Sequence, residues 1–149
     1  MQPSPLARYL LARGLWEQAV AAWSPLAADP RDAEAQFGLG TALEGSGAPE
    51  AAVEHLRRAV ALDPGVTRYR EGLARRLWAS EQYYQAINEW RTVKSQAPRN
   101  LEARAALGRA YETIGERFEA LREYREILDL DPRHAGARDG VARLTGRRP

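Results

Sequence analysis

The sequence predicts an all-α protein, built from antiparallel helix-turn-helix hairpins that repeat every 34 residues. Prolines keep that spacing along the chain, at Pro30, Pro64, Pro98 and Pro132. An alanine column keeps it as well, at Ala52, Ala86 and Ala120. A third column pairs an aliphatic residue with a small one, at Leu39-Gly40, Leu73-Ala74, Leu107-Gly108 and Val141-Ala142. Because these columns share one period, we interpret them as internal repeats.

Within one period the apolar pattern is helical. Apolar residues of the segment 33–44 follow spacings of three and four, at Ala35, Leu39, Ala42 and Leu43. The sequence Gly-Ser-Gly at 45–47 interrupts this helix, and Pro49 suits the first turn of the next one. The second helix ends before Pro64, because proline cannot continue a helix. Each period is therefore predicted to be helix, tight turn, helix and proline-marked turn.

The small columns indicate where helices cross closely. A side chain larger than alanine would push two crossing helices apart, so Gly40 with Ala52, and Gly108 with Ala120, are expected at such crossings. Large side chains recur at one position of the second helix, at Trp23, Leu56, Trp90 and Tyr124. One hairpin cannot bury these faces alone, so neighbouring hairpins are expected to stack on one another.

These columns resemble the tetratricopeptide repeat (TPR), whose signature has a small residue at position 8, alanine at 20, a large residue at 24 and proline at 32. Segments 33–66 and 101–134 match it in register, whereas 67–100 has Glu81 where glycine is usual. The segment 3–32 is one residue short before Pro30. The aromatic residue often found at position 4 is replaced throughout, by Gln36, Arg70, Arg104 and Arg138.

The resemblance implies a right-handed solenoid of TPR hairpins in a single domain, residues 1–149. Its repeats would span about 3–32, 33–66, 67–100 and 101–134, followed by a capping helix over 135–145. In that helix Ala137, Val141 and Leu144 would cover the last hairpin, while Arg138 and Arg143 stay in solvent.

Composition excludes several classes of function. The chain has no cysteine, so disulfides, thiolate metal sites and cysteine nucleophiles are excluded. It carries 22 basic and 20 acidic residues, a net charge of +2 that gives no general attraction to nucleic acid. No apolar run reaches the roughly 20 residues of a membrane span, and residues 1–5 do not begin a secretory signal. A cytoplasmic protein is therefore expected.

In the TPR family the first helices of successive hairpins line a concave groove in which ligands usually lie. The resemblance implies that positions 2, 5, 9 and 12 of each first helix face that groove. The candidate peptide-binding residues are Phe37, Thr41, Glu71, Arg75, Trp78, Arg109, Glu112 and Arg143. Position 6 between them is small, at Gly38, Gly72, Ala106 and Gly140, and is expected to form a floor that an extended peptide can approach.

Two interpretations of the groove arginines stay open. Arginine forks could hold carboxylates of an acidic partner segment, with Phe37 and Trp78 as apolar anchors. Alternatively, Glu71 with Arg75, and Asp139 with Arg143, could simply pair on the helix surface at a spacing of four.

The favoured function is a protein-protein interaction scaffold that binds a partner protein or peptide, by analogy with the family. Self-association through the apolar side chains Leu6, Leu10 and Leu11 is an alternative. A nucleic-acid-binding solenoid is less favoured, because acids are interleaved in the groove columns. We expect no enzyme, cofactor, metal or small-molecule substrate, since no convergent set of titratable residues can be assembled and His55 and His134 lack ligating neighbours in sequence.

Overall fold

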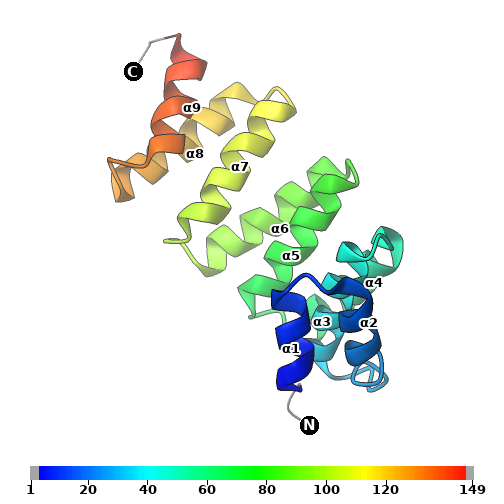
Figure 1. Cartoon of the computed structure of the whole chain (residues 1–149). Coiled ribbons are helices and arrows are strands. Elements are labelled where there is room, and N and C mark those ends of the chain that lie inside the picture. The colour runs from blue at the N-terminus through cyan, green and yellow to red at the C-terminus, as the bar shows by residue number, and fades with distance from the viewer. Residues whose placement is uncertain (1–3, 147–149) are drawn as a thin grey trace. The chain divides into compact units, whose positions relative to one another are not determined.

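A computed structural model describes residues 4–146, and within that stretch the chain forms nine α-helices and no strand (Figure 1). The first hairpin has short helices, α1 (Pro5–Ala12) and α2 (Trp16–Trp23). The later helices have 11 to 14 residues: α3 (Ala33–Gly45), α4 (Pro49–Leu62), α5 (Thr67–Ala79), α6 (Tyr83–Gln96), α7 (Leu101–Thr113), α8 (Arg117–Leu130) and α9 (Ala135–Thr145). The predicted helix-turn-helix period is confirmed.

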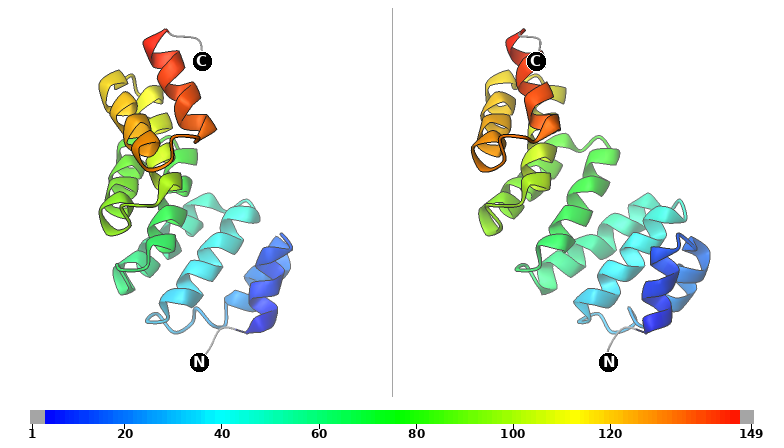
Figure 2. Two further views of the ribbon diagram at one scale, coloured as in Figure 1. Left: turned by 90° about the vertical axis from the view of Figure 1, so that its left-hand side faces the viewer. Right: turned by 60° about the vertical axis from the view of Figure 1, so that its left-hand side comes forward.

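Contacts divide the chain into two compact units, Met1–Glu81 and Gln82–Pro149. Unit 1 contains α1 to α5, and unit 2 contains α6 to α9. Within each unit, helices that follow one another in sequence pack side by side (Figure 2). The boundary falls between α5 and α6, inside the predicted repeat 67–100. The single domain over 1–149 stays a prediction, and the two units are described separately below.

Local signals explain where the helices begin and end. The side chains of Asp32 and Asn100 cap α3 and α7 by accepting hydrogen bonds from the third amide along, at 2.9 and 3.0 Å. His134 caps α9 in the same way, through Nδ1 at 3.1 Å from the Ala137 amide. Helix α2 ends at Trp23 because Pro25 follows: its ring would clash with the carbonyl four residues earlier. The first hairpin is therefore shorter than the others.

The turns inside the hairpins require a left-handed backbone residue. Gly47 and Gly115 supply it, with φ values of +88° and +85°. Glu81 occupies the equivalent place between α5 and α6 and adopts φ +60°. Although Glu81 replaces the glycine usual at this position, the backbone keeps the left-handed conformation. Glycine adopts this conformation at a lower free-energy cost than glutamate does.

The buried residues match the predicted packing columns. Trp23, Leu56, Trp90 and Tyr124 are between 1 and 6% exposed. A Cβ atom on Gly40 would lie 2.9 Å from Leu56 Cγ, and one on Gly108 would lie 2.5 Å from Tyr124 Cε1. The small column at position 8 is thus needed because the large side chain of the second helix lies directly against it.

Helix α9 covers the last hairpin within unit 2, as predicted. Ala137 is fully buried there, and Val141 and Leu144 pack against the core cluster around Tyr124. Arg138 and Arg143 are exposed, which gives α9 one apolar and one solvated face. Across residues 4–146 no helix is long and apolar enough to cross a membrane.

Candidate interaction surfaces

The first helices of unit 1 form a continuous surface, because α3 packs against both α1 and α5. We call this the unit 1 first-helix face. It carries five of the predicted groove residues together with three charged neighbours: Arg8, Glu34, Phe37, Thr41, Arg68, Glu71, Arg75 and Trp78.

Ion pairs join the three first helices of this face. Glu34 on α3 accepts a hydrogen bond from Arg8 of α1 at 2.8 Å and lies 3.4 Å from Arg68 of α5. Glu44, at the other end of α3, is 3.9 Å from Arg76 of α5. Exposed pairs of this kind contribute about 0–1 kcal/mol each, so they mainly set which charges remain available.

Phe37 lies between α3 and α5 and is only half-buried. Its ring centroid is 4.9 Å from that of Tyr69, at an interplanar angle of 36°. The Arg68 guanidinium lies 5.7 Å from the Phe37 ring and 5.2 Å from the Tyr69 ring, within the range of cation–π attraction. The predicted apolar anchor is therefore held in place by its own aromatic and cationic neighbours.

The remaining candidate residues of unit 1 differ in their exposure to solvent and in the contacts of their side chains. The Thr41 hydroxyl donates to the Phe37 carbonyl at 2.9 Å, so its proton is already used. Glu71 and Trp78 are half-buried. Arg75 is exposed, and within residues 4–146 no ion pair or hydrogen bond engages its side chain, Glu71 included. The alternative in which Glu71 neutralises Arg75 is not what the structure shows.

In unit 2 the candidate residues neutralise one another. Arg143 of α9 donates to Glu112 of α7 at 2.9 and 3.4 Å, and the Tyr124 hydroxyl donates to the same carboxylate at 2.5 Å. The alternative in which Asp139 pairs with Arg143 is not found in the described part of the chain, because Arg143 reaches across to α7 instead. Arg109 is exposed.

These contacts shift the pKa values of Glu112 and Tyr124. Burial alone would raise the pKa of Glu112, but the hydrogen bonds from Arg143 and Tyr124 outweigh it and hold that pKa below its usual value. Burial, together with the neighbouring Glu112 carboxylate, raises the pKa of Tyr124. The phenol therefore stays protonated and remains a hydrogen-bond donor.

The predicted small-residue floor is wrong, because the protein's own aromatic rings occupy the space beside three of its four residues. A Cβ atom on Gly38 would lie 2.4 Å from the Trp23 ring, one on Gly72 2.8 Å from Phe37, and one on Gly140 2.4 Å from Tyr124. Glycine is needed at these positions to accept rings from neighbouring helices, and an approaching peptide would meet those rings.

The two histidines have structural partners. His55 Nδ1 is 2.7 Å from the side-chain oxygen of Gln36, and burial of the imidazole lowers the pKa of His55. His134 caps α9 as described above. Among residues 4–146 no group of three or more histidine, aspartate or glutamate side chains is arranged to hold a metal ion.

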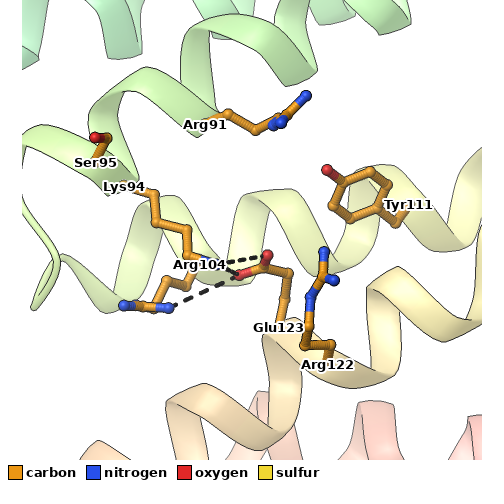
Figure 3. A pocket seen from close by; sticks show the side chains of 7 residues that line it. All are labelled: Arg91, Lys94, Ser95, Arg104, Tyr111, Arg122 and Glu123. Atoms are coloured by element: carbon orange, nitrogen blue, oxygen red, sulfur yellow. Dashed lines mark hydrogen bonds and ion pairs between the residues drawn. The ribbon is translucent and has the colours of Figure 1, made fainter.

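Unit 2 also contains a pocket that sequence reasoning missed. It has a volume of ≈ 320 Å³ and lies between α6, α7 and α8 (Figure 3). Its lining is polar and mostly cationic: Arg91, Lys94, Ser95, Arg104, Tyr111, Arg122 and Glu123. None of these residues belongs to the predicted groove set.

The comparisons with known proteins identify the family. The tetratricopeptide repeat model matches residues 5–67 and again 72–135. The chain is a member of the TPR family. Among curated proteins none matches it.

Solved TPR structures share this fold. A crystal structure of MamA superimposes with a TM-score of 0.86 at 21% identity, covering 97% of this chain and 87% of that one. MamA from Desulfovibrio magneticus RS-1, residues 41 to the end, gives 0.83 at 23% identity, with 95% and 81% covered. YrrB, described as a TPR protein with an unusual peptide-binding site, gives 0.79 at 23% identity, with 89% and 69% covered. These similarities show a solenoid fold of helical hairpins. Members of the TPR family are typically non-enzymatic interaction scaffolds.

TPR position 4 supplies one of the residues that line the pocket. Arg104, which stands at that position in α7, donates to the Pro98 carbonyl at 2.8 Å and so ties the preceding proline turn to the helix. Arg70 makes the same type of contact with the Pro64 carbonyl, at 3.4 Å. Polar side chains thus replace the aromatic residue usual at this position, and Arg104 is the only pocket residue at which the sequence analysis noted a departure from the TPR pattern.

A charged network surrounds Arg104. Lys94 of α6 donates to both oxygens of Glu123 at 2.8 and 2.9 Å and lies 2.9 Å from Glu126. Arg104 forms an ion pair with Glu126 and lies 3.9 Å from Glu123. Burial of Glu126 alone would raise its pKa, but Lys94 and Arg104 lower it below the usual value. Two cations and two anions therefore balance one another beneath the pocket.

Proposed function

We propose that this TPR protein is a non-catalytic interaction module that binds an acidic or carboxylate-bearing segment of a partner protein on the unit 1 first-helix face. The observation that carries the proposal is Arg75, an exposed guanidinium with no partner among residues 4–146. Half-buried Phe37 and Trp78 lie on the two helices α3 and α5 of the same face. A free fork of donors beside aromatic side chains suits a carboxylate flanked by apolar residues.

The other charges of the face favour a peptide over a nucleic acid. Glu34 holds Arg8 and Arg68, so these arginines are not free to follow a phosphate backbone. A single available arginine provides one point of charge recognition, which fits a short acidic motif. The groove residues Arg109, Glu112 and Arg143 of unit 2 would contribute less, since Glu112 and Arg143 already satisfy each other.

A peptide library tests the proposal directly. Fluorescently labelled peptides of equal length, carrying acidic, neutral or basic side chains around one aromatic residue, would be titrated with the protein and followed by anisotropy. Acidic peptides should bind best, and Arg75→Glu/Trp78→Ala should weaken that binding by about tenfold or more. The matched control is Arg125→Glu/Tyr84→Ala, which reverses one exposed arginine and truncates one exposed aromatic residue in unit 2.

Equal loss in the two double variants, or no preference for acidic peptides, would reject this face as the binding surface. Circular dichroism of each variant establishes that the helices are intact. Pull-down with the wild type and the two variants then identifies partners, because proteins that depend on the face disappear only with Arg75→Glu/Trp78→Ala.

Self-association is the second candidate, and exposed apolar residues of α1 favour it. Leu6 is 59% exposed and Tyr9 is 55% exposed. Leu10, which the sequence analysis named for self-association, is only 7% exposed and packs in the core of unit 1. Light scattering over a dilution series of wild type and Leu6→Ser/Tyr9→Ser tests this candidate, which requires the wild type alone to show a mass that rises with concentration.

A further inference from the structure

The pocket between α6, α7 and α8 has an excess of positive charge. Lys94 and Arg104 are balanced by Glu123 and Glu126, as described above. Two further lining cations, Arg91 on α6 and Arg122 on α8, have no ion pair or hydrogen bond within the described chain. Two positive charges therefore remain uncompensated at the pocket.

The free donors converge on one space. In Figure 3 the side chains of Arg91 and Arg122 extend toward the same opening, and the Tyr111 hydroxyl points into it from α7. Neither the Tyr111 hydroxyl nor that of Ser95 has a hydrogen-bond partner among residues 4–146. Two guanidinium groups, from α6 and α8, and the phenol hydroxyl of Tyr111 from α7 thus face the opening, whereas Ser95 lies further along α6.

The buried carboxylate of Glu123 does not cancel this arrangement. Glu123 is 2% exposed, and Lys94 occupies both of its oxygens. The negative charge of Glu123 is therefore compensated by Lys94 and Arg104 at the base of the pocket. The groups that remain available to a ligand at the opening are all hydrogen-bond donors with net positive charge.

We infer that this pocket binds a phosphate dianion. A phosphate group carries about two negative charges near neutral pH and offers three acceptor oxygens, which matches two free guanidinium groups and a phenol. The volume of ≈ 320 Å³ exceeds that of the anion itself and leaves room for the group that carries it. The two sources of such a group are free inorganic phosphate and a phosphorylated side chain of a protein.

Isothermal titration calorimetry at about pH 8, where a phosphate monoester is fully ionised, tests the inference. Three probes are titrated into the full chain: inorganic phosphate, a Gly-phosphoserine-Gly peptide and the unphosphorylated Gly-Ser-Gly peptide. Saturable binding of at least one phosphate probe, with none for Gly-Ser-Gly, is expected. Tighter binding of the phosphopeptide indicates a protein source, and equal binding of the two indicates free phosphate.

Variants locate the site. Arg91→Gln/Arg122→Gln should weaken phosphate binding by about tenfold or more, because both free guanidinium groups are removed. Tyr111→Phe should weaken it by a smaller factor, about threefold, through loss of one neutral donor. The control Arg99→Gln/Arg125→Gln removes two exposed arginines of unit 2 that do not line the pocket, and should leave binding unchanged.

The inference is overturned if no phosphate probe binds saturably to the wild type. It is also overturned if the control variant loses as much affinity as Arg91→Gln/Arg122→Gln, since binding would then follow total charge. The result is independent of the unit 1 first-helix face, because Arg75→Glu/Trp78→Ala leaves every lining residue of this pocket in place.

Discussion

Two hairpins, α3/α4 in unit 1 and α7/α8 in unit 2, share one frame and differ at TPR position 4. In α3/α4 that position is Gln36, which is fully buried and donates to the Ala27 carbonyl at 3.0 Å while facing His55 of α4. In α7/α8 it is Arg104, and the residue at the place of His55 is Glu123. The α3/α4 hairpin thus contains a neutral hydrogen-bond network, and the α7/α8 hairpin contains a charged one.

The difference shows how one repeat position can hold different side-chain networks while the helical hairpin stays the same. The neutral amide and imidazole satisfy each other and the preceding turn, so nothing remains for a ligand. The charged network needs a lysine from α6 and a second carboxylate, and it lies beneath an opening at which Arg91 and Arg122 stay unpaired. The same position therefore belongs to a neutral network in one hairpin and to a charged network beside a pocket in the other.

The largest effect is expected from breaking the charged network. Glu123→Gln leaves Lys94 with one carboxylate partner and should lower the free energy of unfolding by about 3 kcal/mol, because a buried ion pair loses one member. Urea denaturation followed by circular dichroism measures the change. Glu116→Gln, an exposed glutamate at the start of α8, is the control and should stay within about 0.5 kcal/mol of the wild type. A loss below about 1 kcal/mol for Glu123→Gln would mean that solvent screens the network.

Breaking the neutral network should cost less. Gln36→Leu removes the partner of His55 Nδ1 and of the Ala27 carbonyl, for a loss of about 2 kcal/mol in the same assay. The double variant Gln36→Leu/His55→Leu should be less destabilised than the sum of the two single variants, since the orphaned imidazole is removed with its partner. Strict additivity would show that the two side chains are not coupled.

The turns of the two hairpins should respond alike. Gly47→Ala and Gly115→Ala should each lower the free energy of unfolding by about 1 kcal/mol, because both glycines have a positive φ. An added Cβ atom meets nothing within 4 Å at either position, so no steric clash contributes to this cost. Glu81→Gly should stabilise by a similar amount, about 1 kcal/mol, by relieving the same conformation. Gly65→Ala, with no positive φ and only Asp63 Oδ1 nearby at 3.7 Å, serves as the control. Thermal melts of the four variants rank them.

The smallest expected change in stability comes from the glutamates at TPR position 12, Glu44 in α3 and Glu112 in α7. Glu112→Gln should cost about 0.5–1 kcal/mol at neutral pH, whereas Glu44→Gln should cost less, because Glu44 reaches Arg76 only at 3.9 Å. The pKa of Glu112 is lowered in the folded chain, so its contribution is complete above the usual value of 4.5 and is lost as the pH falls through the folded value. Urea melts from pH 7 to 3 should therefore show the difference from wild type shrinking below about pH 4.5. A difference that persists at pH 3 would point to packing.

Much of the fold could be predicted from the sequence because its signals are local. Pro64 and Pro132 end helices wherever they occur in such a pattern, and the glycines at Gly47 and Gly115 specify the turns. The buried column from Trp23 to Tyr124 followed from periodicity alone. The candidate interaction surfaces were harder to predict. The glycines at position 6 are recognisable in sequence, but which ring lies against each of them depends on the neighbouring hairpin.

By itself, the sequence determined the period, the helix boundaries, the buried columns and the TPR family, because backbone restrictions and apolar burial act over a few residues or one repeat. Only the tertiary structure decided which charges meet. Arg143 pairs with Glu112 in another helix instead of with Asp139 four residues away, and Lys94 joins Glu123 across 29 positions. The physical reason is that an exposed ion pair between residues four apart contributes only about 0–1 kcal/mol, so spacing in sequence cannot select the partner of a charged residue. The packing of the helices makes that choice, and in residues 4–146 it leaves Arg75, Arg91 and Arg122 without an ion pair or a hydrogen bond.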